Sequence, residues 1–260
     1  MSWLAAEPSK AAAERFVLIY SPVWMALVGT VMLAGLYRGW SDLAYMTFGL
    51  AAALPLIVVP WLRPAAADRD RRPWQTSWFR MNLWVAILVW FGSYFGSEYF
   101  FDVLGMRYEF PTTWNLDAAL VGSGSDEVPL FLYPLTQAYF MTYHVVMTVL
   151  YRRMQARWSL GPLTRVALIA GLAYAVAFAE TFFMAIPALR DVFSYPDRGR
   201  MLMIGSLFYA SYFVISLPVF SRIDEGRPWT IGDTIGSSLA VCMGVLIVLD
   251  GWTLMFGRLL

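Results

Sequence analysis

The chain alternates between long apolar stretches and short polar ones. Seven stretches are long enough to cross a bilayer, whose hydrocarbon core requires about 20 residues per helix. They run approximately over residues 16–37, 43–62, 80–104, 130–151, 164–189, 201–221 and 232–256. Pro22, Pro55 and Pro218 lie inside them and predict kinks, which a helix bundle tolerates. The pattern therefore predicts an all-α, polytopic transmembrane bundle of about seven helices, forming a single domain over residues 1–260.

Composition agrees with a membrane protein. The chain is 59% hydrophobic and 14% charged, and its mean hydropathy of +0.57 is too high for a soluble domain. The net charge of +1 gives no reason to expect a nucleic-acid partner. Cys242 is the single cysteine, which excludes an intramolecular disulfide and a cysteine-rich metal site. The first apolar stretch follows Glu7 and Glu14 and is too long for a signal peptide, so we expect it to remain as an anchor.

Basic residues are distributed unevenly between the two sets of loops. The N-terminal segment and the loops after the second, fourth and sixth stretches carry 13 lysines and arginines, whereas the opposite side carries six. The positive-inside rule then predicts a cytoplasmic N-terminus and a C-terminus on the far side. The longest loop, residues 105–129, falls on the far side. It could be a lid over a site or a connector, and we favour the connector.

Four ionisable residues lie inside the predicted spans: Glu98, His144, Glu180 and Asp250. A charge at bilayer depth costs at least ~2.5–3.5 kcal/mol, so such residues usually face the protein interior and have a function. A helix rises about 1.5 Å per residue, which places the three carboxyls roughly 9–13 Å below the far-side ends and His144 near the midplane. They could line one cavity. The alternative for each is a polar group that only bonds a neighbouring helix, and for His144 that alternative is equally good.

Aromatic residues crowd the same stretches. On the third stretch, Trp84 and Glu98 recur at helical spacing, and Tyr94 lies one turn before Glu98. Gly92 and Gly96 leave room for the backbone of a neighbouring helix. Packing accounts for most such aromatic residues in a membrane helix. The functional alternative is a pocket for a large, rigid, apolar ligand, in which ring faces could also stabilise a cation.

Glu180 follows Ala173 and Ala177 on one helical face. Small residues allow a neighbouring helix to approach closely, so we expect this carboxyl to be buried. Burial favours the protonated form of a carboxyl, which can then act as a general acid. His144 could relay a proton to it or orient it.

Several signatures of other functions are missing from the sequence. No apolar stretch contains a lysine, which argues against a retinal Schiff base, and there is no phosphate-binding glycine loop and no GxSxG nucleophile motif. A metal site that uses His144 with carboxylates lacks any ligand-spacing motif. We therefore expect no metal and no cofactor, and proton transfer on an apolar molecule as the chemistry.

Several segments resemble the cyclopropyl-sterol isomerase (cycloeucalenol cycloisomerase) family known from plants. They are EYFFDVLGMRYEFP (98–111), FMTYHV (140–145), AFAET (177–181), LFYASYFVISLPVFSRIDE (207–225) and VLDGWTLMFG (248–257), preceded by EPSK (7–10), YSPVW (20–24) and NLW (82–84). The resemblance implies an enzyme that opens the 9β,19-cyclopropane ring of a sterol without a cofactor. It would add a proton at C19, remove one at C8 and leave an 8,9 double bond.

The resemblance also implies functional positions, including Asp224 and Glu225. The plant family has histidine where this chain has Glu98, so the catalytic role at that position is open. Together with the depth estimates, the predicted catalytic residues are Glu180, His144, Glu98 and Asp250, and the predicted substrate-binding residues are Trp84, Tyr94, Tyr143, Tyr174, Tyr209 and Tyr212.

Short loops and the arginine bias are typical of a bacterial member, which predicts a protein of the bacterial inner membrane, or of the endoplasmic reticulum in a eukaryote. Its partners would be a sterol substrate in the bilayer and membrane lipids. Two alternatives remain open: a proton-coupled carrier of apolar lipids, and a sterol-binding protein without catalytic activity.

Overall fold

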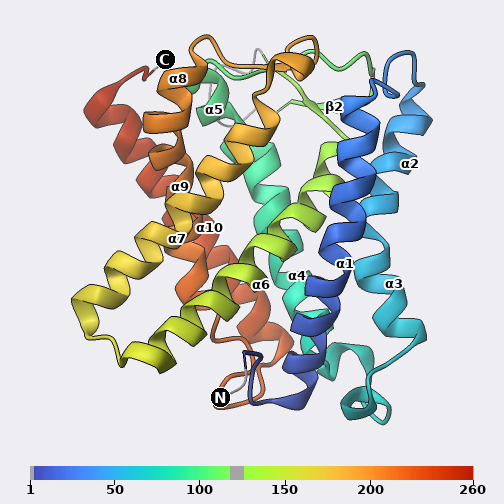
Figure 1. The fold of residues 1–260 in the computed structure, drawn as a ribbon, viewed down its shortest axis with the longest axis vertical. Helices are drawn as coiled ribbons and strands as arrows, with labels where there is room; N and C mark the ends of the chain where they lie inside the picture. Colours follow the sequence, from blue (N-terminus) through green and yellow to red (C-terminus); the bar gives the residue numbers. More distant parts are fainter. Residues whose placement is uncertain (1–2, 118–125, 260) are drawn as a thin grey trace.

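The computed structural model describes residues 3–117 and 126–259, and in these ranges the chain is mostly helical (Figure 1). The long helices are α1 (Pro8–Leu33), α6 (Leu132–Trp158), α7 (Pro162–Met184), α9 (Ser206–Phe220) and α10 (Ile231–Phe256). Helices α2 (Asp42–Ala53) and α3 (Pro55–Leu62) form one run with a bend of 49°. The bend falls at Pro55, which cannot donate a backbone hydrogen bond to the preceding turn.

In the described part of the chain, two helical runs contain a π-helical turn. In the first, α4 (Ser77–Phe91) passes through η3 (Gly92–Gly96) into α5 (Ser97–Leu104). In the second, the short α8 (Arg198–Arg200) passes through η5 (Met201–Gly205) into α9. The sequence predicted uninterrupted helices in both places. A π turn widens the helix locally and is frequent at functional sites.

Short elements complete the fold. Three 3₁₀ turns are η1 (Ala66–Asp68), η2 (Pro73–Gln75) and η4 (Pro187–Leu189). The strands are β1 (Arg107–Tyr108), β2 (Asn115–Leu116), β3 (Val128–Pro129) and β4 (Phe193–Ser194). Antiparallel pairs form between β1 and β4 and between β2 and β3. The described part of the 105–129 loop therefore packs against the rest of the chain, at the end of the bundle where the C-terminus lies (Figure 1). Residues 118–125 of this loop, which we predicted to be a connector, lie outside the described residues.

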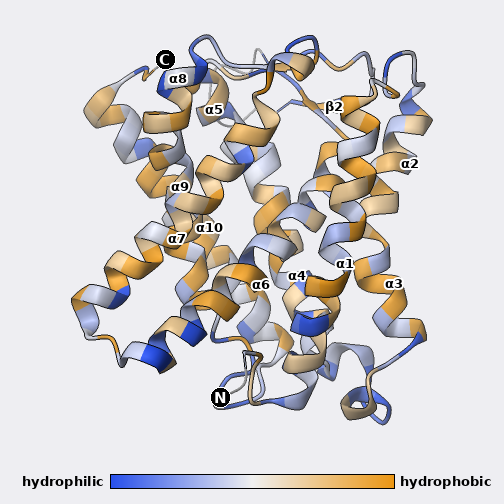
Figure 2. Cartoon of the chain, in the orientation of Figure 1, coloured by the Kyte–Doolittle hydropathy of each residue, from blue (hydrophilic) through white to orange (hydrophobic). Residues whose placement is uncertain are grey.

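Within residues 3–117 and 126–259, four helical segments are long and apolar enough to cross a membrane: Pro8–Leu33, Pro162–Met184, Arg198–Phe220 and Ile231–Phe256. The bent pair of α2 and α3 is a possible fifth span. Figure 2 shows that apolar residues predominate along these helices. The predicted span 80–104 is divided between α4 and α5, and each of these helices alone is too short to cross a membrane. The predicted span 130–151 corresponds to α6, which is long enough but too polar to be recognised as a crossing by its composition. The chain is thus a helical membrane protein, and its helices agree with the predicted positions more closely than with the predicted number of crossings.

A polar cluster closes the end of the bundle where the N-terminus lies. Lys10 is fully buried; its ammonium donates to the carbonyl of Ser221 at 2.6 Å and pairs with Glu225 at 3.0 Å. Arg152 bridges Glu225, at 2.5 Å, and the buried Glu14, at 2.8 Å. These contacts join α1, α6 and the loop between α9 and α10.

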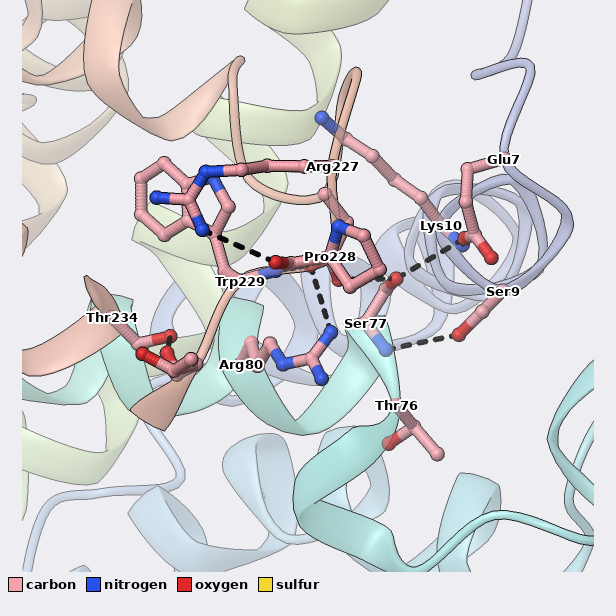
Figure 3. Close-up of polar contacts among 12 residues, drawn as sticks. Glu7, Ser9, Lys10, Thr76, Ser77, Arg80, Arg227, Pro228, Trp229 and Thr234 are labelled. Atoms are coloured by element: carbon pink, nitrogen blue, oxygen red, sulfur yellow. Dashed lines mark hydrogen bonds and ion pairs between the residues drawn. The ribbon is translucent and has the colours of Figure 1, made fainter. Parts of the chain in front are cut away.

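Asp224 is the centre of a second set of contacts at this end. It accepts hydrogen bonds from the Arg80 guanidinium at 2.8 Å, the Ser77 hydroxyl at 2.7 Å and the backbone amide of Trp229 at 2.8 Å. Figure 3 shows Arg80 and Ser77 of α4 pointing toward the loop that carries Trp229. These bonds hold the backbone of Asp224 in the left-handed region (φ 56°), which residues other than glycine adopt only infrequently. Asp224 and Glu225, which the family resemblance singled out, thus fasten the bundle here.

Candidate active site in an aromatic cavity

A cavity of about 120 Å³ lies between the η3–α5 run, α6, α7 and α9, toward the end of the bundle covered by β1 and β4. Nearly half of the residues that line it are aromatic: Phe100, Tyr108, Phe110, Tyr139, Phe140, Phe193, Tyr195, Tyr209 and Tyr212. Few polar groups share this lining. They are Glu180, the hydroxyls of the tyrosines, and four serines and threonines: Ser93, Ser97, Thr136 and Thr181.

Glu180 is the single carboxylate in the described lining of the cavity. It is carried by α7, which packs against α9, and Ala173 and Ala177 are fully buried on the same face. The small residues allow the close helix approach that the sequence predicted. Tyr209 of α9 donates its hydroxyl hydrogen to Oε2 of Glu180, and the hydroxyl of Tyr143 lies close to the same carboxyl. These donated hydrogen bonds would stabilise the carboxylate that is left once Glu180 has transferred a proton.

Tyr212 lies against the π turn, and its ring also contacts that of Tyr209. A Cβ atom on Gly96 would fall 1.7 Å from the Tyr212 hydroxyl, and one on Gly92 would fall 3.2 Å from its ring. We expected Gly92 and Gly96 to leave room for the backbone of a neighbouring helix, but the space beside them is occupied by the Tyr212 side chain. Tyr212 is only 2% exposed, and its hydroxyl makes no hydrogen bond within residues 3–117 and 126–259.

His144 is fully buried but does not line the cavity. Its Nδ1 lies 2.8 Å from the carbonyl of Phe140, and its Nε2 lies 2.7 Å from the hydroxyl of Ser216 on α9. A carbonyl only accepts, so Nδ1 donates; in the neutral ring Nε2 then accepts from Ser216. Trp84 packs edge-on against His144, and its indole donates to Ser237 of α10 at 3.1 Å. His144 and Trp84 therefore join helices behind the cavity wall.

The other two predicted catalytic carboxyls lie elsewhere. Asp250 is exposed on α10 and accepts a hydrogen bond from Tyr99 at 3.4 Å. Glu98 is 1% exposed in the first turn of α5 and does not line the cavity, although its neighbour Ser97 does. The depth estimate placed both residues at a suitable level but could not tell which way each side chain points.

Of the six predicted substrate-binding residues, the structure brings Tyr209 and Tyr212 to the cavity. Tyr143 lies next to it, in contact with Phe140 and Phe213. Tyr174 bonds the carbonyl of Leu202 at 3.5 Å, and Tyr94 packs on Phe95; neither lines the cavity.

Sequence reasoning missed the residues that close the cavity. Tyr108 of β1 and Phe193 of β4 come from loops, and their strands pair directly. Met106 and Phe110 flank Tyr108 in the lining. The available signal was a group of aromatic residues within otherwise polar loops. No group of three metal-ligating residues occurs in the part of the chain that the structure describes.

Comparison with known proteins places the chain in a family. No protein-family model and no solved structure matches it. Cycloeucalenol cycloisomerase of Arabidopsis thaliana is 35% identical to it over 264 residues, which cover 98% of this chain and 89% of that protein. The alignment therefore spans the helices of the cavity as well as the polar cluster. The chain therefore belongs to the cycloeucalenol cycloisomerase family and is an isomerase.

Proposed function

We propose that the protein opens the 9β,19-cyclopropane ring of cyclopropyl sterols such as cycloeucalenol and gives the 8-ene sterol. The observation that carries this proposal is the pairing of Glu180 with Tyr209 in a cavity rich in aromatic rings. A weakly basic ring carbon accepts a proton only from an acid held against it in a dry site. The cavity offers one such acid.

In the proposed first step, Glu180 transfers a proton to C19 while the bond between C9 and C19 breaks. C19 becomes a methyl group, and C9 is left with a positive charge. The hydrogen bond that Tyr209 donates to Oε2 stabilises the carboxylate that forms. The reaction needs no electron transfer and hence no redox cofactor.

The cationic intermediate would be stabilised by ring faces. Phe100 and Phe140 line the cavity, and each contacts Tyr212. The face of an aromatic ring is electron-rich and attracts a cation within about 6 Å of its centroid. Aromatic walls also exclude the water that would otherwise trap the cation as an alcohol.

The second step removes the proton from C8 and closes the double bond. C19 and the hydrogen on C8 lie on the same face of the sterol, so one carboxyl can serve both steps. Glu180 would donate as an acid and accept as a carboxylate, returning to its starting form. We propose Glu98, which is buried next to the cavity-lining Ser97, as a second proton-handling group, and we assign His144 and Asp250 no contact with substrate.

The cavity is smaller than the roughly 300–1,000 Å³ of most small-molecule sites. A sterol could therefore enter only if side chains in the wall move. We propose that it enters from the bilayer, since α7, which carries Glu180, is one of the least buried helices and exposes Phe182 and Phe183.

We further propose seven membrane crossings with a cytoplasmic N-terminus. Helix α1 begins at one end of the bundle and α10 ends at the other (Figure 1), as an odd number of crossings requires. Helix α6 and the α4–η3–α5 run would cross inside the bundle, where fewer apolar residues are needed. The 13-to-6 excess of basic residues sets the direction. With its short loops, the chain would lie in a bacterial inner membrane, or in the endoplasmic reticulum of a eukaryote.

Turnover by purified protein tests the proposed function. The protein in lipid nanodiscs is incubated with a cyclopropyl sterol, and the products are separated and identified by mass spectrometry and by the lost cyclopropane proton signals in NMR spectra. We expect conversion to the 8-ene sterol. Bound but unchanged sterol would indicate a binding protein, and proton-driven movement of unchanged sterol between vesicles would indicate a carrier.

A further inference from the structure

Three hydroxyl groups gather on one wall of the cavity. Ser93 and Ser97 line it from the η3–α5 run, and Tyr212 lines it from α9. The three residues are 8%, 7% and 2% exposed. None of their side chains makes a hydrogen bond within the ranges 3–117 and 126–259, so their hydrogen-bonding capacity is unused.

The local helix geometry explains why these groups are together. Ser93 and Ser97 are four residues apart across the π turn, so both can face the cavity. The ring of Tyr212 rests on Gly92 and Gly96, which flank Ser93 in the same turn. The glycines thus seat the phenol beside the two serines.

The remaining polar groups of the cavity are arranged differently. Tyr209 and Tyr212 both lie on α9, but the hydroxyl of Tyr209 is bonded to Glu180 of α7, whereas that of Tyr212 meets Gly96 of η3. Thr136 and Thr181 come singly from α6 and α7. The hydroxyl of Tyr209 is thus engaged by Glu180, whereas those of Tyr212, Ser93 and Ser97 make no hydrogen bond within the described ranges 3–117 and 126–259.

We propose that Ser93, Ser97 and Tyr212 form the subsite for the hydroxyl group of the sterol, an inference that rests on the proposed function. A sterol carries a hydroxyl, which both donates and accepts, on an otherwise apolar ring system. The three side-chain hydroxyls can do the same, and buried polar groups are normally hydrogen-bonded. A sterol held at the π turn by its hydroxyl would present its ring system to the rest of the cavity, whose lining includes Glu180.

A substrate without the hydroxyl tests this subsite. We would measure kcat/KM for a 3-hydroxy cyclopropyl sterol and for its 3-deoxy analogue, which is smaller and cannot clash. The wild-type protein should prefer the hydroxylated sterol by roughly 10- to 100-fold, the value of one or two buried hydrogen bonds. Equal kcat/KM values for the two sterols would overturn the proposal.

Variants assign the preference to residues. Tyr212→Phe and the double variant Ser93→Ala/Ser97→Ala should each lower kcat/KM for the hydroxylated sterol and leave the deoxy value almost unchanged, so that the preference falls below about threefold. Tyr20→Phe removes a phenol that bonds the backbone of Ala51 and Ala52 outside the cavity, and it should keep the wild-type preference. The subsite would be contradicted if both cavity variants kept the wild-type preference for the hydroxylated sterol. It would also be contradicted if each variant lost kcat/KM equally for the hydroxylated and the deoxy sterol.

Binding separates this inference from the proposed reaction. Equilibrium dissociation constants of the two sterols for the wild-type protein in nanodiscs should show the same preference. If neither sterol turns over but the hydroxylated one binds more tightly and loses that advantage in Tyr212→Phe, the proposed reaction is wrong and the subsite stands. Equal binding of the two sterols would reject the subsite even if turnover occurs.

Discussion

Tyr209 donates a hydrogen bond to Glu180 across the interface of α7 and α9. The pair depends on how closely the two helices approach, which the fully buried Ala173 and Ala177 allow. It faces a cavity in which no other carboxylate lines the described wall. Glu180 is therefore the first candidate for any proton transfer by a carboxyl group in this cavity.

Glu180→Gln should lower turnover of a cyclopropyl sterol by about 10²- to 10⁴-fold, because the amide keeps the shape but cannot donate a carboxyl proton. Initial rates of sterol isomerisation measure the effect. Glu109→Gln changes an exposed glutamate in the 105–129 loop and should retain the wild-type rate. Near-normal turnover by well-folded Glu180→Gln protein would remove Glu180 from the chemistry.

Glu98→His should keep measurable activity, whereas Glu98→Ala should lose most of it, because both Glu and His can transfer protons and Ala cannot. The comparison uses the same isomerisation rates, with thermal unfolding as a check that both variants are folded. If both variants turn over sterol as the parent does, Glu98 is a packing or hydrogen-bonding residue.

Gly96→Ala should displace Tyr212, because the added methyl would lie 1.7 Å from the phenol oxygen. Overpacking of this kind costs about 1–3 kcal/mol, which corresponds to a fall in melting temperature of roughly 3–10 °C for a chain of this length. Activity should fall as well, since the cavity wall shifts. Gly29→Ala in α1 meets nothing within 4 Å and should leave melting temperature and activity unchanged. A stable, fully active Gly96→Ala protein would show that Tyr212 has another position.

Ser216→Ala should destabilise the protein more than it slows catalysis. It leaves Nε2 of the buried His144 without a partner, at a cost of about 1–3 kcal/mol. We expect a lower melting temperature and a kcat within about tenfold of the wild-type value. A loss of kcat above 100-fold at an unchanged melting temperature would instead place His144 in the proton pathway.

Acid should weaken the polar cluster at the N-terminal end. Burial tends to raise the pKa of the Glu225 carboxyl, but the positive charges of Lys10 and Arg152 outweigh this and lower its pKa below the ordinary 4.5. The stability from this pairing is then fully present above about pH 4.5 and is lost as the pH falls through the lowered value. Melting temperatures of the wild-type and Glu225→Gln proteins should differ at pH 7 and converge in acid. A constant difference at all pH values would argue against the pairing.

The length of the apolar stretches predicted the helices of this fold but not their interruptions. Stretches such as 164–189 and 232–256 agree with α7 and α10 because a membrane-facing helix must be apolar over about 20 residues. The π turns at Gly92–Gly96 and Met201–Gly205 leave no mark on hydropathy, since they add a residue to the turn without changing its character. The polarity of α6 likewise reflects burial inside the protein, which hydropathy alone cannot recognise.

The sequence could indicate the orientation of a site residue only where neighbouring residues restricted it. The alanines before Glu180 indicated the face that packs on α9, where they are fully buried and Glu180 itself is half-buried. The family resemblance pointed to Tyr209 and Tyr212. Depth alone failed for Asp250, because residues at one level of a helix can face the interior or the outside. Tyr108 and Phe193 reach the cavity through a strand pairing between distant loops, a long-range contact that no local pattern encodes.

Position-resolved deuterium analysis of the product formed in D₂O tests the proposed chemistry most directly. One proton passes from Glu180 to C19, so the new methyl group of the 8-ene sterol should carry between zero and one deuterium, depending on how often the C8 proton is reused before Glu180 exchanges with solvent. Glu180→Gln should form almost no labelled product. Two or more deuteriums on that methyl would show repeated, reversible protonation, and unchanged sterol recovered from folded protein would contradict the isomerisation itself.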